Sequence, residues 1–152
     1  MQVELYKEVN SPVEEGQVVQ LVKTALRALR KSNSISISVA IVSAKTGRAL
    51  NKSCRGVESV PSVLSFEETV SKNRRNSFIS PVQKEKYIGE IVITDPVVKK
   101  RAKENSSSYS KEFGFLFVHG FLHLMGYTHK QNIRANLMER QEDRIMNLLN
   151  NR

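Results

Sequence analysis

Apolar and polar residues alternate in three stretches of the chain, residues 2–6, 34–43 and 87–94. Successive side chains of a β-strand point to opposite faces, so this period of two predicts three strands with at least one buried face. A fourth strand is expected at residues 63–66, a short apolar run that is entered through Pro61.

Apolar residues recur every three or four positions in other stretches, and that period predicts amphipathic helices. The first helix is expected to begin at a capping box between Ser11 and Glu14, with Pro12 at its first helical position. It should run to about Lys31. We expect the later helices at residues 48–55, 95–104, 109–124 and 133–149, with a break at 105–108.

Two polar segments complete the pattern. Residues 45–47 are expected to form a turn, and residues 67–85 a mobile loop or irregular hairpin. The order of strands and helices predicts one α+β domain over residues 1–152, a mixed sheet with helices packed on it. The core side of the last helix is expected to comprise Leu137, Ile145, Met146, Leu148 and Leu149.

All three histidines of the chain lie between positions 119 and 129. His119 and His123 are four residues apart, so on a helix they lie on the same face. Gly126 stands where a helix can end in a left-handed residue, which allows the chain to turn back and bring His129 towards the other two. Three neutral imidazoles with an open fourth position form a catalytic type of zinc site. We therefore expect one Zn²⁺ per chain, held by these three residues.

The composition indicates which cellular compartment and which class of partner to expect. Lysine and arginine exceed aspartate and glutamate by 24 − 15 = 9, which favours nucleic acid as the first candidate partner and an anionic membrane surface as the second. A single cysteine excludes an internal disulfide and is typical of a reducing compartment. The start of the chain lacks the apolar core of a signal peptide, and the most apolar stretch, residues 113–127, is too short to span a bilayer. We expect a soluble cytoplasmic protein with no membrane partner.

A catalytic zinc site suits hydrolysis of a carbonyl or a phosphoryl group, and two positions bear on the choice. Zinc peptidases carry a glutamate general base after the first histidine, whereas this chain has Gly120, although its histidine spacing matches the metzincin peptidases. A phosphodiester substrate needs a cation beside the phosphoryl group, and Arg55 is the candidate for this role, with an ordinary surface arginine as the alternative. Cys54 beside it is expected to be a buried apolar filler. The residues expected to bind nucleic-acid phosphates are Arg74, Arg75, Lys99, Lys100, Arg101 and Lys103.

The run H-G-x-L-H-L-x-G-Y-x-H, which covers residues 119–129, resembles the metal motif of the YbeY family of zinc-dependent endoribonucleases. Two other segments are similar to the same family. Asn51, Arg55-Gly56 and residues 63–66 resemble its N-x-x-Y-R-x-K-D-x-P-T-D-V-L-S-F segment. Residues 89–93 resemble its G-D-I-V-I segment, and the similarity is continuous from about residue 50 to the C-terminus.

The resemblance implies a mixed four-stranded sheet with helices and a zinc ion at the mouth of a basic cleft. His119, His123 and His129 would be the zinc ligands and catalytic residues, and Arg55 the basic catalytic residue that lines the cleft. The implied activity is zinc-dependent cleavage of single-stranded RNA, in 3′-end maturation of 16S ribosomal RNA and in ribosome quality control in a bacterial cytoplasm. The implied partners are the 16S precursor and the small ribosomal subunit.

Several positions depart from the family pattern. Thr128 stands where the family usually has an aspartate, which could orient a histidine or a water molecule. The departures keep one alternative function open, a ribosome-associated RNA-binding protein with a structural zinc and little activity. The histidine spacing leaves a second alternative, a metzincin-like zinc peptidase. The other departures are Cys54, Glu58, Glu90 and the run at residues 60–62.

Overall fold

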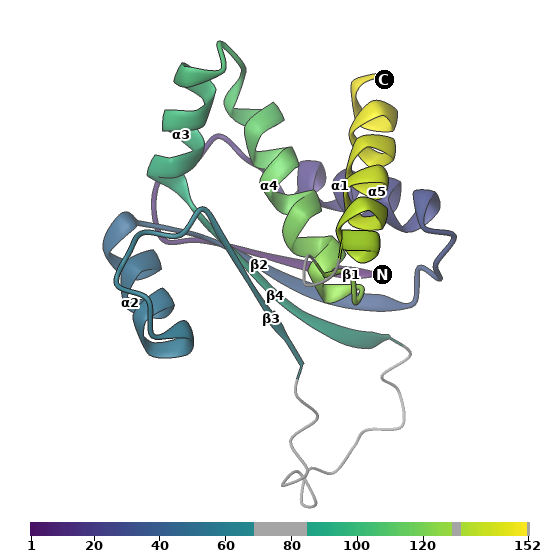
Figure 1. Ribbon diagram of the computed structural model, residues 1–152, viewed down its shortest axis with the longest axis horizontal. Helices are drawn as coiled ribbons and strands as arrows, with labels where there is room; N and C mark the ends of the chain where they lie inside the picture. The colour runs from purple at the N-terminus through teal and green to yellow at the C-terminus, as the bar shows by residue number, and fades with distance from the viewer. Residues whose placement is uncertain (69–84, 129–131, 152) are drawn as a thin grey trace, which may run out of the picture.

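The computed structural model describes residues 1–68, 85–128 and 132–151, without the side chains of residues 132–134. Most of the polar segment expected at residues 67–85 therefore lies outside the described residues. Strands and helices alternate first, and three consecutive helices end the chain (Figure 1). The elements are β1 (Gln2–Lys7), α1 (Glu15–Ala28), β2 (Ile35–Val42), α2 (Ala44–Arg55), β3 (Val63–Glu67), β4 (Lys86–Thr94), α3 (Asp95–Glu104), α4 (Tyr109–Leu124) and α5 (Asn132–Asn150).

The described strands form one mixed sheet in the order β1-β2-β4-β3. β1 and β4 both run parallel to β2, whereas β3 runs antiparallel to β4. Parallel neighbours need a crossover connection, and α1 provides it between β1 and β2. The mixed sheet predicted from the order of elements is confirmed, as are the four strands implied by the family resemblance.

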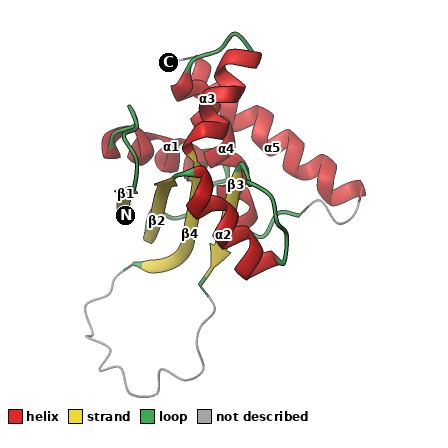
Figure 2. Cartoon of the chain, turned by 90° about the vertical axis from the view of Figure 1, so that its left-hand side faces the viewer, coloured by secondary structure: helices red, strands yellow, loops and turns green. Residues whose placement is uncertain are grey.

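Helices cover both faces of the sheet because both faces of its central strands are apolar. In β2, Val39 and Ile41 belong to the main core, whereas Ala40 and Val42 belong to a second cluster on the opposite face. In the main core, α1, α4 and α5 pack against one face of the sheet. On the other face lies α2, whose Leu50 packs against the second cluster (Figures 1 and 2). The result is a three-layer arrangement with the sheet in the middle.

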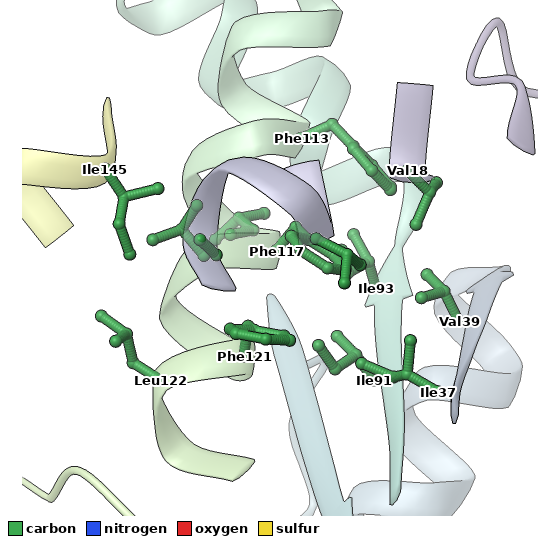
Figure 3. Close-up of a cluster of buried hydrophobic side chains, with 14 of the residues drawn as sticks. Val18, Ile37, Val39, Ile91, Ile93, Phe113, Phe117, Phe121, Leu122 and Ile145 are labelled. Carbon is green, nitrogen blue, oxygen red and sulfur yellow. The ribbon is translucent and has the colours of Figure 1, made fainter. Parts of the chain in front are cut away.

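α4 is the central helix of the main core. Phe113, Phe117 and Phe121 recur along one side of it and are at most 1 % exposed. Figure 3 shows Phe117 next to Ile93 of β4, Phe121 at the level of Ile91, and Phe113 next to Val18 of α1. Burying each ring stabilises the fold by roughly 1.5–3 kcal/mol, so the sheet holds this helix firmly. No helix in the described part of the chain is long and apolar enough to cross a bilayer.

α1 begins later than the capping box at Ser11 predicts, and that prediction is wrong. The helix starts behind Glu14, whose N–H donates to Oε1 of Gln17 at 2.9 Å. The hydroxyl of Ser11 accepts a hydrogen bond from the N–H of Val13 and donates one to the hydroxyl of Tyr109. Ser11 is therefore used to join this loop to α4. At its other end the helix stops at Ala28, short of the predicted limit.

The turn predicted at residues 45–47 is also wrong, because these residues lie within α2. Ser43 is the N-cap of this helix, and its hydroxyl accepts a hydrogen bond from the N–H of Thr46 at 3.2 Å. Gly47 is buried, and a Cβ atom at this position would lie 2.6 Å from Oγ1 of Thr94. Gly47, which suggested a turn in the sequence, instead allows α2 to pack closely against the end of β4.

The core face of α5 differs in part from the predicted one. Leu137 and Leu148 are 45 % and 40 % exposed, whereas Met138 is fully buried. Ile145 is buried as predicted, and Met146 and Leu149 pack against the main core. Apolar residues occur on more than one side of this helix, so the direction of its neighbours α1 and α4 decides which of them are covered.

β4 changes its pairing at Gly89, where the backbone takes a φ of +134°. The register between β2 and β4 shifts at this point, between Ser36 and Ile37 of β2. A Cβ atom at Gly89 would lie 2.2 Å from the carbonyl oxygen of Phe66 and 3.1 Å from Leu124. Glycine therefore allows β3 and the C-terminal end of α4 to approach β4 closely.

Candidate metal centre and substrate cleft

The C-terminal half of α4 carries two of the three histidines in the predicted zinc site. α4 begins behind Ser108, whose hydroxyl accepts a hydrogen bond from the N–H of Lys111 at 3.1 Å. His119 and His123 are half-buried, on the side of α4 that faces away from Phe113, Phe117 and Phe121. Their Nε2 atoms are 3.2 Å apart. The predicted placement of these two histidines on one helix face is confirmed.

The second ring nitrogen of each histidine has its own partner. Nδ1 of His119 is 2.6 Å from Oε1 of Glu142, and Nδ1 of His123 is 3.1 Å from the backbone carbonyl oxygen of Tyr127. An ionised carboxylate and a carbonyl can only accept, so each Nδ1 donates its hydrogen. A neutral imidazole has one N–H, and the lone pairs on Nε2 therefore face the space between the two rings.

This pair of nitrogens fits a zinc ion. With Zn–N distances of about 2.0–2.1 Å, two nitrogens of a tetrahedral site lie about 3.3 Å apart. The observed separation is 3.2 Å. A carboxylate or a carbonyl on the second ring nitrogen is also the usual outer partner of a zinc-bound histidine.

The third predicted ligand, His129, lies outside the described residues. Within the described residues no three His, Cys, Asp or Glu side chains converge on one point. The zinc ion and its third ligand therefore remain predictions.

The chain turns back after α4, as the glycine predicts. Gly126 has a φ of +92°, and the N–H of Tyr127 donates to the carbonyl oxygen of Leu122 at 3.0 Å. This turn brings Thr128 to the lining of the same cleft as the two histidines. The described chain thus returns to the histidine side of α4 one residue before His129.

A cleft of about 730 Å³ brings Arg55 together with His119 and His123. α4 forms one wall, the edge strand β3 forms another, and the last residues of α2 close the third side. Arg55 and the histidines come from distant parts of the chain, and the packing of α2 and α4 at the two faces of β3 and β4 brings them together.

The end of α2 determines where Arg55 lies. Gly56 caps the helix in the left-handed conformation, at a φ of +69°. The buried side chain of Asn51 donates a hydrogen bond to the carbonyl oxygen of Ser59 at 3.0 Å and anchors the loop that leads to β3. Arg55 is exposed at the cleft, where it can reach an anionic substrate. Cys54 is exposed as well, so its predicted role as a buried filler is wrong.

Gly120 has a packing role. A Cβ atom at this position would lie 3.1 Å from Cγ2 of Ile91 and 3.1 Å from Cγ2 of Val63. The position faces the sheet, and its lack of a side chain lets α4 approach β3 and β4 closely. The side chain of a peptidase-type glutamate at this position would crowd Ile91 and Val63.

The basic residues predicted on α3 lie apart from the cleft. Nε of Arg101 donates to Oε2 of the buried Glu112 at 3.2 Å, and its guanidinium group lies 5.1 Å from the ring centre of Phe115. Arg101 therefore joins α3 to α4. Glu112 stands two helical turns before His119, about 10 Å along the axis of α4.

The remaining predicted phosphate-binding residues have mixed surroundings. Nζ of Lys99 is 2.9 Å from Oδ2 of Asp95, and Lys100 and Lys103 are exposed. Arg74 and Arg75 lie outside the described residues. The residues predicted on α3 but absent from the cleft lining are Lys99, Lys100, Arg101 and Lys103.

Glu142 is a site residue that the sequence analysis missed. It lies on α5 and is only 9 % exposed. The signal was present as a charged residue within the stripe formed by Met138, Ile145 and Leu149. A glutamate at a core position is rare without a partner, and its partner here is His119.

Comparison with known proteins gives consistent matches. The family model described as "Endoribonuclease YbeY" matches residues 4–150. A protein of that name from Caldanaerobacter subterraneus subsp. tengcongensis is 32 % identical over 137 residues, which cover 89 % of this chain and 87 % of the relative. Another from Geobacillus thermodenitrificans is 30 % identical over 152 residues, 96 % and 94 % of the two chains. The solution structure of a Thermotoga maritima protein has the same fold, with a TM-score of 0.60 at 22 % identity, over 95 % of this chain and 87 % of that one.

The family model covers every segment that builds the cleft. It spans α2 and β3, α4 with its following turn, and all of α5. The resemblance found in the sequence motifs is confirmed, and the chain belongs to the YbeY family of endoribonucleases.

Proposed function

We propose that this protein is a zinc-dependent endoribonuclease that cleaves single-stranded RNA in 3′-end maturation of 16S ribosomal RNA and in ribosome quality control. Membership in a family whose members are named endoribonucleases supports RNA as the substrate class. The observation that supports zinc is the pair of Nε2 atoms 3.2 Å apart, on rings whose Nδ1 atoms each meet an acceptor.

His119, His123 and His129 would hold the zinc ion. Bound there, zinc would supply Lewis-acid chemistry that polarises the phosphodiester group. Glu142 and the carbonyl group of Tyr127 keep the ring protons on Nδ1 of His119 and His123. With the ring hydrogens on Nδ1, each Nε2 carries a lone pair, which is the form that binds a metal.

Arg55 would bind the phosphoryl oxygens. Its planar guanidinium group can donate two parallel hydrogen bonds to a phosphate, and this contact strengthens as negative charge develops on the oxygens. The open cleft between α4 and β3 suits a single strand, because a flexible backbone can follow a recess on the protein surface. The position of Arg55 at this cleft explains how a residue outside the metal motif would take part in the reaction.

A second candidate function is RNA binding without efficient cleavage. The residue that favours it is Thr128. This residue lines the cleft at the position where the family usually has an aspartate. A carboxylate can accept a proton at neutral pH, whereas a threonine hydroxyl cannot serve as such a base. Zinc would then have a structural role.

Cleavage of a labelled single strand that spans the 3′ end of a 16S precursor tests the proposal. The protein would be assayed as purified, after chelation, and after zinc is added back, with a duplex of the same sequence as the control substrate. Cleavage that chelation abolishes and zinc restores would support the proposal. Binding without cleavage in all three states would favour the second candidate, and cleavage unaffected by chelation would contradict the role of zinc. A 2′,3′-cyclic phosphate on the product would show that the RNA hydroxyl attacks the phosphorus.

A further inference from the structure

We propose that Glu142 is a positioning residue for the metal centre, and that it raises zinc affinity by fixing His119 in the ring orientation and tautomer that zinc requires. This inference rests on the proposed zinc site, and it assigns a function to α5, which contributes no predicted ligand. The carboxylate would act through His119 and would not touch the metal or the substrate.

The contact between the two side chains is short and largely shielded from water. Oε1 of Glu142 lies 2.6 Å from Nδ1 of His119, and the side chains are 12 % and 28 % exposed. Met138 and Ile145, one turn before and one turn after Glu142, are fully buried. The packing of α5 against α4 therefore sets the position of this carboxylate, and little freedom remains for it to bind elsewhere.

The partners of the two imidazoles fit the tautomer that a shared cation requires. If both rings carried hydrogen on Nε2, two N–H groups would repel each other across 3.2 Å, and two lone pairs at that distance repel as well unless a cation lies between them. A carboxylate at Nδ1 of His119 holds the ring hydrogen on that nitrogen and leaves the Nε2 lone pair directed at the other ring. The carboxylate also makes the imidazole a stronger donor to a cation.

A simple helix-to-helix contact is the competing explanation, and it makes a different prediction. An ion pair between a positively charged His119 and Glu142 would stabilise the metal-free fold. It would weaken zinc binding, because the proton on Nε2 would have to leave first. A positioning role instead predicts that removal of the carboxylate lowers zinc affinity more than it lowers the stability of the metal-free protein.

Two substitutions and one matched control separate these explanations in the full-length chain. Glu142→Gln keeps the volume and an acceptor oxygen but removes the negative charge, and Glu142→Ala removes the contact. Glu139→Gln makes the same chemical change at an exposed position of the same helix. Zinc dissociation constants would be measured by competition with a chromophoric chelator. Thermal unfolding would be followed with and without zinc.

We expect Glu142→Ala to raise the zinc dissociation constant about 10- to 100-fold, as the loss of such an outer partner typically does. Glu142→Gln should raise it by about tenfold and should melt close to the wild type when zinc is absent. The rise in melting temperature on adding zinc should be smaller in both variants than in the wild type, because it follows the affinity. Glu139→Gln should match the wild type in every measurement.

Zinc dissociation constants equal to the wild-type value in both Glu142 variants would overturn the proposal and leave the zinc site intact. The proposal would also be overturned if Glu142→Gln lost stability without zinc and its zinc affinity stayed the same or rose, since that pattern belongs to a helix-to-helix contact. A wild-type protein that binds no zinc would overturn both this inference and the metal part of the proposed function. The first two outcomes concern Glu142 alone.

Discussion

His119 and His123 share one face of α4 but are fixed by different groups. A side-chain carboxylate on α5 holds the first, and the backbone carbonyl of Tyr127 holds the second. The first contact depends on the docking of another helix, whereas the second depends on the turn at Gly126. The two imidazoles therefore respond to different parts of the structure.

Substitution of a histidine ligand tests the metal assignment directly. The wild type should contain about one zinc per chain after removal of excess metal, and both His119→Ala and His123→Ala should lose most of it. Two imidazoles and water bind zinc far more weakly than three imidazoles do. Elemental analysis measures the content, with Lys111→Ala as a control on the exposed side of the same helix. Full zinc occupancy in His123→Ala would remove this residue from the ligand set.

Arg55→Ala should slow cleavage more than it weakens RNA binding. An interaction made mainly in the transition state contributes roughly 2–4 kcal/mol, or about 30- to 1000-fold in rate. Arg55→Lys should recover only part of the activity, because lysine keeps the charge but lacks the planar fork. Single-turnover cleavage by zinc-loaded proteins measures the rates. Three equal rates, at equal zinc content, would make Arg55 an ordinary surface arginine.

α2, which carries Arg55, is held at its N-terminus by a residue from another element. The Glu8 carboxylate, just after β1, accepts hydrogen bonds from the N–H of Ser43 at 3.1 Å and from the hydroxyl of Thr46 at 2.8 Å. A negative charge at the first turn of a helix also matches the positive end of the helix dipole. The position of α2 and of the cleft wall at its far end thus depends partly on β1.

Glu8→Gln should destabilise the metal-free protein at neutral pH, and the difference from wild type should shrink in acid. Hydrogen bonds from the side chains of Ser43 and Thr46 and from the Ser43 backbone lower the pKa of the Glu8 carboxyl. A carboxyl whose pKa is lower in the folded state stabilises that state above its ordinary value of 4.5, and this contribution is lost as the pH falls through the lowered value. Urea unfolding from about pH 7 to about pH 3 measures the difference. A difference that stays constant over this range, or that appears equally in Glu139→Gln, would contradict the explanation.

Gly47→Ala should destabilise the protein although alanine is the better helix former. The new Cβ atom would lie 2.6 Å from the buried Oγ1 of Thr94, and the resulting shift costs about 1–3 kcal/mol, more than the gain in helix propensity of about 1 kcal/mol. Addition of Thr94→Ala should restore part of the loss, because it removes the atom in conflict. Denaturant unfolding of both single variants and the double variant gives the coupling energy. Purely additive effects would show that the two positions do not interact.

The fold places its basic residues on more than one surface. Arg55 lies at the cleft between α2, β3 and α4, whereas the run on α3 is near the other end of α4. Figure 1 shows α3 beside the start of α4 and away from its C-terminal end. A short RNA in the cleft would not reach α3, and a long RNA would have to extend along α4 to contact it.

RNA binding should depend steeply on salt, and the length of the RNA should reveal whether α3 takes part. Each neutralised phosphate of a single strand contributes about 0.7 to the slope of log affinity against log salt, so Lys100→Gln with Lys103→Gln should reduce the slope by about 1.4 for a long strand. A strand that fills only the cleft should show no change. Lys23→Gln with Arg27→Gln on α1 removes the same charge elsewhere. An affinity that does not vary with salt would contradict electrostatic binding, and equal slopes for the two double variants would remove the specific role of α3.

Local sequence was sufficient for the features that depend on neighbours along the chain. Strand alternation, the break before Tyr109 and the spacing of His119 and His123 all follow from periods of two and 3.6 residues. The turn at Gly126 follows from the conformational freedom of glycine. These predictions held because the interactions that produce them span only a few residues.

Tertiary structure decided the features that depend on distant partners. The sequence placed no residue opposite His119, because the contact with Glu142 exists only when α5 packs on α4. The sequence around Gly47 predicted a turn, but in the structure this glycine lies in a helix and packs against Thr94. Leu137 was predicted in the core, but the neighbours of α5 do not cover it. The sequence made Arg55 a candidate for the phosphoryl group, and the family resemblance supported it, but its proximity to the histidines comes from the packing of α2 and α4 on the sheet. Hydrophobic burial acts on whole faces of an element, so which faces meet is settled by the fold and cannot be read from the pattern of one segment.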